Sequence, residues 1–320
     1  MSTLKDVAIH PFADRHAATD WEPVLRALVP DVHPVDRDAL RIWFSFWPLW
    51  LREAIEETDD PVTLERRYQL DGRYRLDSHL VSSVEILYGA RWWTEVRAAV
   101  LETGRRSVRE ISGISGDLEG EIRTCAVTTA VAAGIGADLL LAVTAVAVAA
   151  LQQLGPATFA AIEDKPASHH GNRDPQAVIR SRKKQRTGLR RVLGPGGYTV
   201  RWDSRDPSAR FQAEPGQNLT MAAATDERDH RAADPRRVEG PIPVQCRSGA
   251  CGYCWTGVLG GRTQLSPIGD FERERLEHFG YRTRGVADDD THPAIRLSCQ
   301  CTVHGDVSIT LPTWNGVHGD

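Results

Sequence analysis

The stretch that decides the fold of this chain is Cys246-Arg247-Ser248-Gly249-Ala250-Cys251-Gly252-Tyr253-Cys254. Three of the six cysteines lie here, in the spacing C-x4-C-x2-C. A fourth, Cys299, is separated from Cys254 by 44 intervening residues and lies within Leu297-Ser298-Cys299-Gln300. Gly249 and Gly252 allow the loop to curl tightly, because glycine readily adopts positive φ angles. The pattern predicts that these four cysteines act together as thiolate ligands.

The spacing is that of a plant-type [2Fe–2S] centre, in which four thiolates hold two bridged irons. Residues 196–320 resemble the plant-type ferredoxin family in this motif and in the Leu-Ser-Cys-Gln context of Cys299. The resemblance implies one [2Fe–2S] cluster per chain, with Cys246, Cys251, Cys254 and Cys299 as its ligands. It also implies that the loop around the cluster consists of Arg247, Ser248, Gly249, Ala250, Gly252 and Tyr253.

The expected order of elements after residue 196 is similar to the β-grasp fold of that family. In chain order it comprises strands at 197–202 and 209–213, a short helix at 217–225, a strand at 255–259, a charged helix at 270–279 and a closing strand at 303–311. The resemblance therefore implies a β-grasp ferredoxin-like domain at the C-terminal end.

Three features depart from the family pattern. Tyr253 is bulky where the family usually has a small or polar residue, and residues 282–293 form an insertion. Cys301 lies two residues after Cys299, and on a strand the two side chains would share one face. We take Cys299 as the ligand because its sequence context matches, and Cys301 as a buried thiol.

The alternatives for the cysteines are a zinc site and a disulfide framework. Structural zinc usually pairs two close C-x2-4-C knuckles, whereas the second pair here is C-x-C. The N-terminal sequence MSTLKDVAIHPF has no apolar core of a secretory signal, which argues against disulfides. We expect a cytoplasmic protein, with a peripheral position on the inner face of the membrane left open.

Charge divides the chain into three parts. Residues 165–195 carry nine Lys and Arg against one Asp, although the whole chain has a net charge of −4. We therefore expect a helical domain at 1–164, a basic linker at 165–195 and the ferredoxin-like domain at 196–320. The basic linker is interpreted as a solvated connector or as a docking segment for an acidic partner or an anionic membrane surface. The net charge argues against nucleic-acid binding.

The N-terminal half has the apolar periodicity of helices. One helix is expected from Asp36 or Asp38 to about Glu57, with a kink at Pro48 and with Trp43, Trp47 and Trp50 on one face. A second is expected at 78–102, ended by Gly104. The tryptophan face is interpreted as core, with a quinone pocket or a membrane-interface belt as the alternative.

Residues 124–154 are the most apolar part of the chain. Gly134-Ile135-Gly136 and Asp138 interrupt this stretch. Two central bundle helices at 117–133 and 139–154, the second stopping at Gly155-Pro156, therefore fit better than one membrane span.

The predicted class is α+β, an all-α N-terminal domain followed by the sheet domain. No dinucleotide motif or P-loop is present, and no catalytic residue is predicted. The first functional hypothesis is a non-catalytic protein that relays single electrons to or from a redox enzyme or a membrane acceptor. The alternative is an iron–sulfur subunit of a larger oxidoreductase, such as an uptake hydrogenase relay or an oxygenase component, whose helical domain binds a quinone or substrate.

Overall fold

The structure is a computed structural model that describes residues 16–46, 59–60, 76–109, 117–162, 166, 173–183, 197–203, 206–279, 281, 289 and 291–311. It divides into two compact units, one holding the described residues up to 166 and the other those from 173 onward. The described part of the first unit contains helices and no strand, whereas the second combines a sheet with helices. The architecture is therefore mixed helix and sheet.

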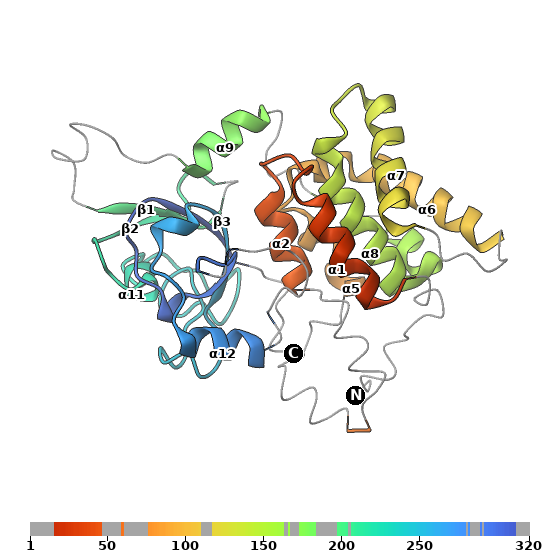
Figure 1. Cartoon of the computed structure of the whole chain (residues 1–320). Coiled ribbons are helices and arrows are strands. Elements are labelled where there is room, and N and C mark those ends of the chain that lie inside the picture. The colour runs from red at the N-terminus through yellow and green to blue at the C-terminus, as the bar shows by residue number, and fades with distance from the viewer. Residues whose placement is uncertain are drawn as a thin grey trace. The chain divides into compact units, whose positions relative to one another are not determined.

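The first unit is a bundle built around one apolar helix. Its helices are α1 (Ala18–Leu28), α2 (Arg37–Phe46), α5 (Leu76–Val84), the 3-10 helix η2 (Tyr88–Trp92), α6 (Trp93–Arg109), α7 (Leu118–Ala133) and α8 (Asp138–Ala161). Helix α8 lies among the other helices of this unit (Figure 1). It contacts α2, α5, α6 and α7 and is buried along most of its length. The two predicted helices are thus confirmed, but only α8 is central, because α7 exposes Val127 (51%) and Val131 (78%). Gly134, at φ 68°, ends α7 in the left-handed conformation that favours glycine.

The predicted stop at Gly155-Pro156 is present as a break within α8. Its backbone leaves the helical region at Gly155 (φ 74°, ψ 161°), and helix resumes from Pro156 to Ala161. Proline fits the first turn of this new segment because it needs no helical N–H bond there. In the described part of the chain, α8 is the one helix long and apolar enough to cross a membrane, and most of that stretch is buried inside the structure.

The prediction of a single helix at 78–102 is wrong. Helices α5 and α6 are separated by Glu85–Leu87 and η2, and Gly104 lies inside α6. The carboxylate of Asp36 accepts hydrogen bonds from the backbone N–H groups of Tyr88 (2.6 Å) and Gly89 (2.9 Å). A Cβ atom on Gly89 would lie 2.8 Å from the Leu139 carbonyl oxygen. The break is therefore imposed by distant contacts.

The tryptophan-bearing helix is described only in part. Helix α2 begins at Arg37, whereas residues 47–58, with Trp47, Pro48 and Trp50, lie outside the described residues. The Trp43 side chain is fully buried, and its indole N–H donates to Ser83 Oγ at 3.0 Å. Trp43 therefore belongs to the core of the first unit.

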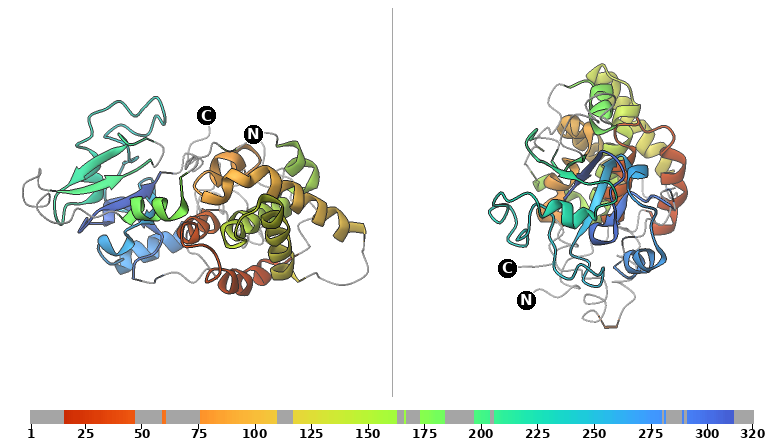
Figure 2. Two further views of the ribbon diagram at one scale, coloured as in Figure 1. Left: turned by 90° about the horizontal axis from the view of Figure 1, so that it is seen from above. Right: turned by 90° about the vertical axis from the view of Figure 1, so that its left-hand side faces the viewer.

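The second unit contains one five-stranded mixed sheet. Its elements are α9 (Pro175–Lys183), β1 (Tyr198–Arg201), β2 (Arg210–Ala213), α11 (Leu219–Ala223), β3 (Trp255–Gly260), the 3-10 turn η3 (Arg262–Gln264), α12 (Asp270–His278), β4 (Ile295–Leu297), the 3-10 turn η4 (Ser298–Gln300) and β5 (Val307–Thr310). The strand order is β2-β1-β5-β3-β4. Strands β1 and β5 pair in parallel and the other neighbours are antiparallel. Figure 2 gives two further views of the ribbon.

The predicted elements of this unit are present, but the closing strand β5 begins at Val307 and not at 303, and β4 was not expected. Strand β4 has three residues, too few to show an alternating pattern, and it exists because it pairs with β3. This pairing brings the residues after β4 next to those before β3.

The basic segment also contains a described helix, α9. It packs against β3 and β5, with Val178 and Arg182 buried. A Cβ atom on Gly260 of β3 would lie 2.7 Å from the Arg182 Cβ atom, so glycine permits this close approach. Helix α9 is therefore part of the second unit, and residues 184–196 lie outside the described residues.

Candidate metal centre

The loop from Cys246 to Cys254 leads directly into β3 and turns sharply along its length. Gly249 has φ 80° and Gly252 has φ 72°, so the predicted need for positive φ is confirmed at both positions. A Cβ atom on Gly249 would lie 2.9 Å from the Phe271 ring, and one on Gly252 would lie 2.9 Å from the Phe279 ring. Glycine is thus required at both positions, because of the positive φ angle and because a larger side chain would meet a phenylalanine ring.

Arg247 is the one described residue other than glycine with a positive φ, at 56°. Its guanidinium bonds to the Glu239 carboxylate and donates to Met221 Sδ at 2.9 Å. These contacts hold a strained residue next to Cys246, and backbone strain of this kind persists only where surrounding contacts enforce it.

The remaining loop residues lie nearer to solvent. Ser248 and Ala250 are exposed and Tyr253 is half-buried. The Ala250 carbonyl accepts a hydrogen bond of 2.7 Å from the Arg275 guanidinium of α12. Helix α12 therefore supports the loop through both Phe271 and Arg275.

The four predicted ligands meet in two pairs. The backbone N–H of Cys251 donates to Cys246 Sγ at 3.4 Å, and that of Cys299 donates to Cys254 Sγ at 3.4 Å. The second pair forms because β3 and β4 are neighbours: Trp255 lies opposite Leu297, and the Ser298 N–H donates to the Cys254 carbonyl at 2.8 Å. Residues 45 positions apart are thereby brought together.

Within each pair the two thiols have opposite pKa shifts. Burial opposes ionisation of Cys246, but hydrogen bonds from Ser248 and Cys251 outweigh it and lower its pKa to about 6. Burial and the bond to Cys246 raise the pKa of Cys251 to about 12. The bond between Cys254 and Cys299 likewise raises the pKa of Cys254 and lowers that of Cys299. Each pair therefore favours one thiolate beside one thiol.

The two pairs differ in their access to solvent. Cys246 and Cys251 are half-buried, whereas Cys254 and Cys299 are buried. The Gln300 side-chain amide donates to Cys299 Sγ at 3.4 Å, and the Asn218 amide donates to the Cys299 carbonyl at 2.9 Å. Asn218 was not predicted to lie at the site, because it precedes Cys299 by 81 residues.

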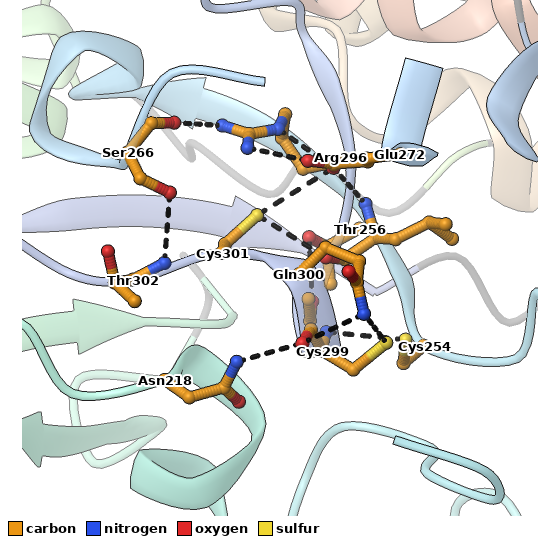
Figure 3. Close-up of polar contacts among 12 residues, drawn as sticks. Asn218, Cys254, Thr256, Ser266, Glu272, Arg296, Cys299, Gln300, Cys301 and Thr302 are labelled. Atoms are coloured by element: carbon orange, nitrogen blue, oxygen red, sulfur yellow. Dashed lines mark hydrogen bonds and ion pairs between the residues drawn. The ribbon is translucent and has the colours of Figure 1, made fainter. Parts of the chain in front are cut away.

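Cys299 and Cys301 do not share a face as a strand would require. The chain forms the 3-10 turn η4 at this point, and Cys301 directs its thiol away from Cys254 (Figure 3). Its sulfur lies 3.3 Å from the Leu297 carbonyl oxygen and 3.9 Å from Glu272 Oε1. Cys301 is fully buried, as predicted, and burial raises the pKa of its thiol well above the ordinary value.

No three His, Cys, Asp or Glu side chains in the described ranges lie together as ligands for a single metal ion. The thiols form two couples instead. A binuclear cluster with two bridging sulfides takes two thiolates on each of its two irons. The donor set therefore fits such a cluster in number, chemistry and pairing.

Comparison of the chain with models of known protein families, with curated proteins and with solved structures gave no match.

Proposed function

We propose that the second unit is a ferredoxin-like β-grasp domain that binds one plant-type [2Fe–2S] cluster, and that the chain relays single electrons. The observation that carries this proposal is the pairing of Cys246 with Cys251 and of Cys254 with Cys299. When bound, such a cluster takes up and returns one electron at a low potential, of order −400 mV in plant-type ferredoxins.

The sheet supports the same proposal. The antiparallel hairpin β1–β2, the parallel pairing of β1 with β5 and the intervening helix α11 agree with the β-grasp arrangement that the sequence resemblance implies. The three-cysteine loop precedes one strand of this sheet and the fourth cysteine follows its antiparallel neighbour. A sheet edge of this kind can hold both ligand segments rigidly, which a pair of loops alone could not.

The protein's own N–H groups and acidic thiols would favour negatively charged sulfur at this site. The N–H groups of Cys251 and Cys299 already point at sulfur atoms, and hydrogen bonds to cluster sulfurs tune the reduction potential. One thiol of each pair is acidic, so each pair needs to lose only one further proton on metal binding. The half-buried Cys246 and Cys251 are the ligands nearer to an approaching redox partner.

Two exposed apolar side chains border the loop. Phe271, 49% exposed, lies against Gly249, and Met221, 52% exposed, lies against Arg247. Exposed apolar groups next to a functional loop favour contact with another protein. We propose a redox protein as the partner, in the cytoplasm or at the inner face of the membrane.

The direct experiment is anaerobic purification of the full chain, followed by metal analysis, visible absorption and EPR after dithionite reduction. The proposal predicts two irons and two acid-labile sulfides per chain and one EPR-active spin in the reduced form. A colourless protein carrying zinc would contradict it. Quinone or flavin recovered in the same preparation would instead favour a subunit of a larger oxidoreductase.

A further inference from the structure

The segment from Arg296 to Thr302 contains two cysteines within three residues. Cys299 faces Cys254, while Cys301 faces the Leu297 carbonyl and Glu272. Both are sulfhydryls on a short, irregular stretch, so the chemistry of the two side chains does not determine which one turns toward the other ligands. The contacts made by the rest of the unit must do so.

A buried ion pair holds the beginning of this segment. Arg296 Nε donates to Glu272 Oε1 at 2.9 Å, and Arg296 Nη2 donates to Glu272 Oε2 at 2.8 Å. The Leu297 backbone N–H donates to the same Oε1 atom at 2.8 Å. The side chains of Arg296 and Glu272 are 1% and 2% exposed, so this bidentate pair is shielded from the water that weakens surface pairs.

Together with Ser266, the Glu272–Arg296 pair forms a clamp on this segment, and Ser266 also holds its other end. Its carbonyl accepts a hydrogen bond from Arg296 Nη1 at 2.8 Å, and its hydroxyl oxygen accepts one from the Thr302 N–H at 3.1 Å. Figure 3 shows these bonds on the two sides of Cys301, with Cys299 pointing to Cys254. The backbone is therefore held both before and after the two cysteines.

Helix α12 connects this clamp to the three-cysteine loop. It supplies Glu272 to the fourth-ligand segment, Phe271 to Gly249 and Arg275 to the Ala250 carbonyl. Three nearby positions of one helix thus contact both ligand-bearing segments. A displacement of Glu272 would change the position of Cys299 relative to the loop.

We propose that Glu272 and Arg296 are positioning residues that select Cys299, and not Cys301, as the fourth cluster ligand. This inference rests on the proposed [2Fe–2S] function. The pair fixes Leu297 and keeps the Cys301 thiol against α12, which leaves Cys299 as the sulfur facing Cys254.

The test compares Glu272→Gln and Arg296→Lys with the wild-type chain. The glutamine variant keeps the shape of the side chain but loses its charge, and the lysine variant keeps the charge but loses the two-pronged contact. The matched control is Asp234→Asn, because Asp234 forms a similar bidentate pair with Arg236, at 2.9 and 2.7 Å, in the same unit. Iron content, the rate of iron release to a chelator and the EPR spectrum of the reduced protein are measured for each.

We expect at least about tenfold faster iron release in both site variants and an EPR signal with shifted g values, while the control matches wild type. A merely structural role would lower the yield of folded protein but leave the surviving clusters with the wild-type spectrum, and that result would overturn the inference. Should Glu272→Gln fail to fold, the milder Arg296→Lys decides by the same criteria.

A second comparison tests whether the Cys301 sulfur competes with the Cys299 sulfur for the cluster. Adding Cys301→Ser to Arg296→Lys should remove the altered signal, because the competing thiol is gone. Persistence of that signal would show that Cys301 does not compete and would overturn the selection. A wild-type chain without an iron–sulfur spectrum would contradict the proposed function itself, which separates the two failures.

Discussion

Each unit of this protein buries a carboxylate that binds backbone N–H groups far away in the sequence, and the two carboxylates hold different kinds of segment. In the helical unit, Asp36 binds the N–H groups of Tyr88 and Gly89. In the sheet unit, Glu272 binds the Leu297 N–H and pairs with Arg296.

The difference lies in what each carboxylate positions. Asp36 holds a break between two helices, and the apolar side chains around that break complete a core. Glu272 holds a segment that carries a predicted metal ligand. Buried carboxylates are costly unless they are fully hydrogen-bonded, so their presence marks backbone that must adopt one conformation. The first unit therefore uses a buried carboxylate for packing, and the second uses one to position a predicted ligand.

The greatest change in iron content is expected from serine substitution of one, but not the other, of the two neighbouring cysteines of the sheet unit. Cys299→Ser should remove nearly all cluster iron, whereas Cys301→Ser should keep it, because Cys299 lies with Cys254 and Cys301 faces α12. Iron analysis and visible absorption of the two variants, purified side by side, measure this. The reverse result would show that the fourth ligand is Cys301.

The metal-free protein should show unequal thiol reactivity within the first pair. The pKa of Cys246 is lowered to about 6 and that of Cys251 is raised to about 12. Because the thiolate is the nucleophile, alkylation of Cys246 should increase as pH rises through about 6 and then level off by about pH 7.5. At neutral pH, it should exceed alkylation of Cys251 by at least about tenfold.

Peptide mass spectrometry after timed iodoacetamide treatment gives both rates. Equal rates for the two thiols across this pH range would contradict the opposite pKa shifts of Cys246 and Cys251. The cluster-bound protein serves as the control and should protect both cysteines.

Substitution of Asp36, the buried carboxylate of the helical unit, should lower the stability of that unit and leave iron binding unchanged. Asp36→Ala leaves two buried N–H groups without an acceptor, so it should lower the free energy of unfolding of the first unit by about 3 kcal/mol. Urea unfolding followed by far-UV circular dichroism measures this. Asp38→Ala, which removes a partly exposed pair with Arg41, is the control and should cost about 0.5 kcal/mol. Loss of iron in Asp36→Ala would break the division of roles between the units.

The smallest expected effect concerns a glycine with a positive φ. Gly134→Ala places a side chain at φ 68° where nothing lies within 4 Å, so it should cost only the backbone preference, about 1 kcal/mol. Gly252→Ala has a similar φ but meets the Phe279 ring, and it should lower iron content as well. Thermal unfolding and iron analysis of both variants check the contrast. Equal behaviour would mean that the contact with Phe279 has no role.

Features that depend on neighbours along the chain could be predicted from the amino-acid sequence. The helices at 117–133 and 139–154 follow from apolar stretches punctuated by glycine, and the strands at 197–202, 209–213 and 255–259 follow from short apolar runs between turn residues. Cysteine spacing identified Cys246, Cys251 and Cys254 as candidate ligands, because a loop that wraps a metal group supplies these ligands locally. Cys299 was identified from its Leu-Ser-Cys-Gln context.

Features that depend on residues far apart in the sequence could not be predicted, because they arise from tertiary contacts. The break before α6 requires Asp36 and α8, and the packing of α9 requires β3 and β5. The pairing of Cys254 with Cys299 requires β4, which is too short to be recognised alone. The opposite directions of Cys299 and Cys301 require Glu272. In each case the deciding contact joins segments that are remote in sequence. The free energy of that contact outweighs the local conformational preference of the residues, which is all that the amino-acid pattern can reveal.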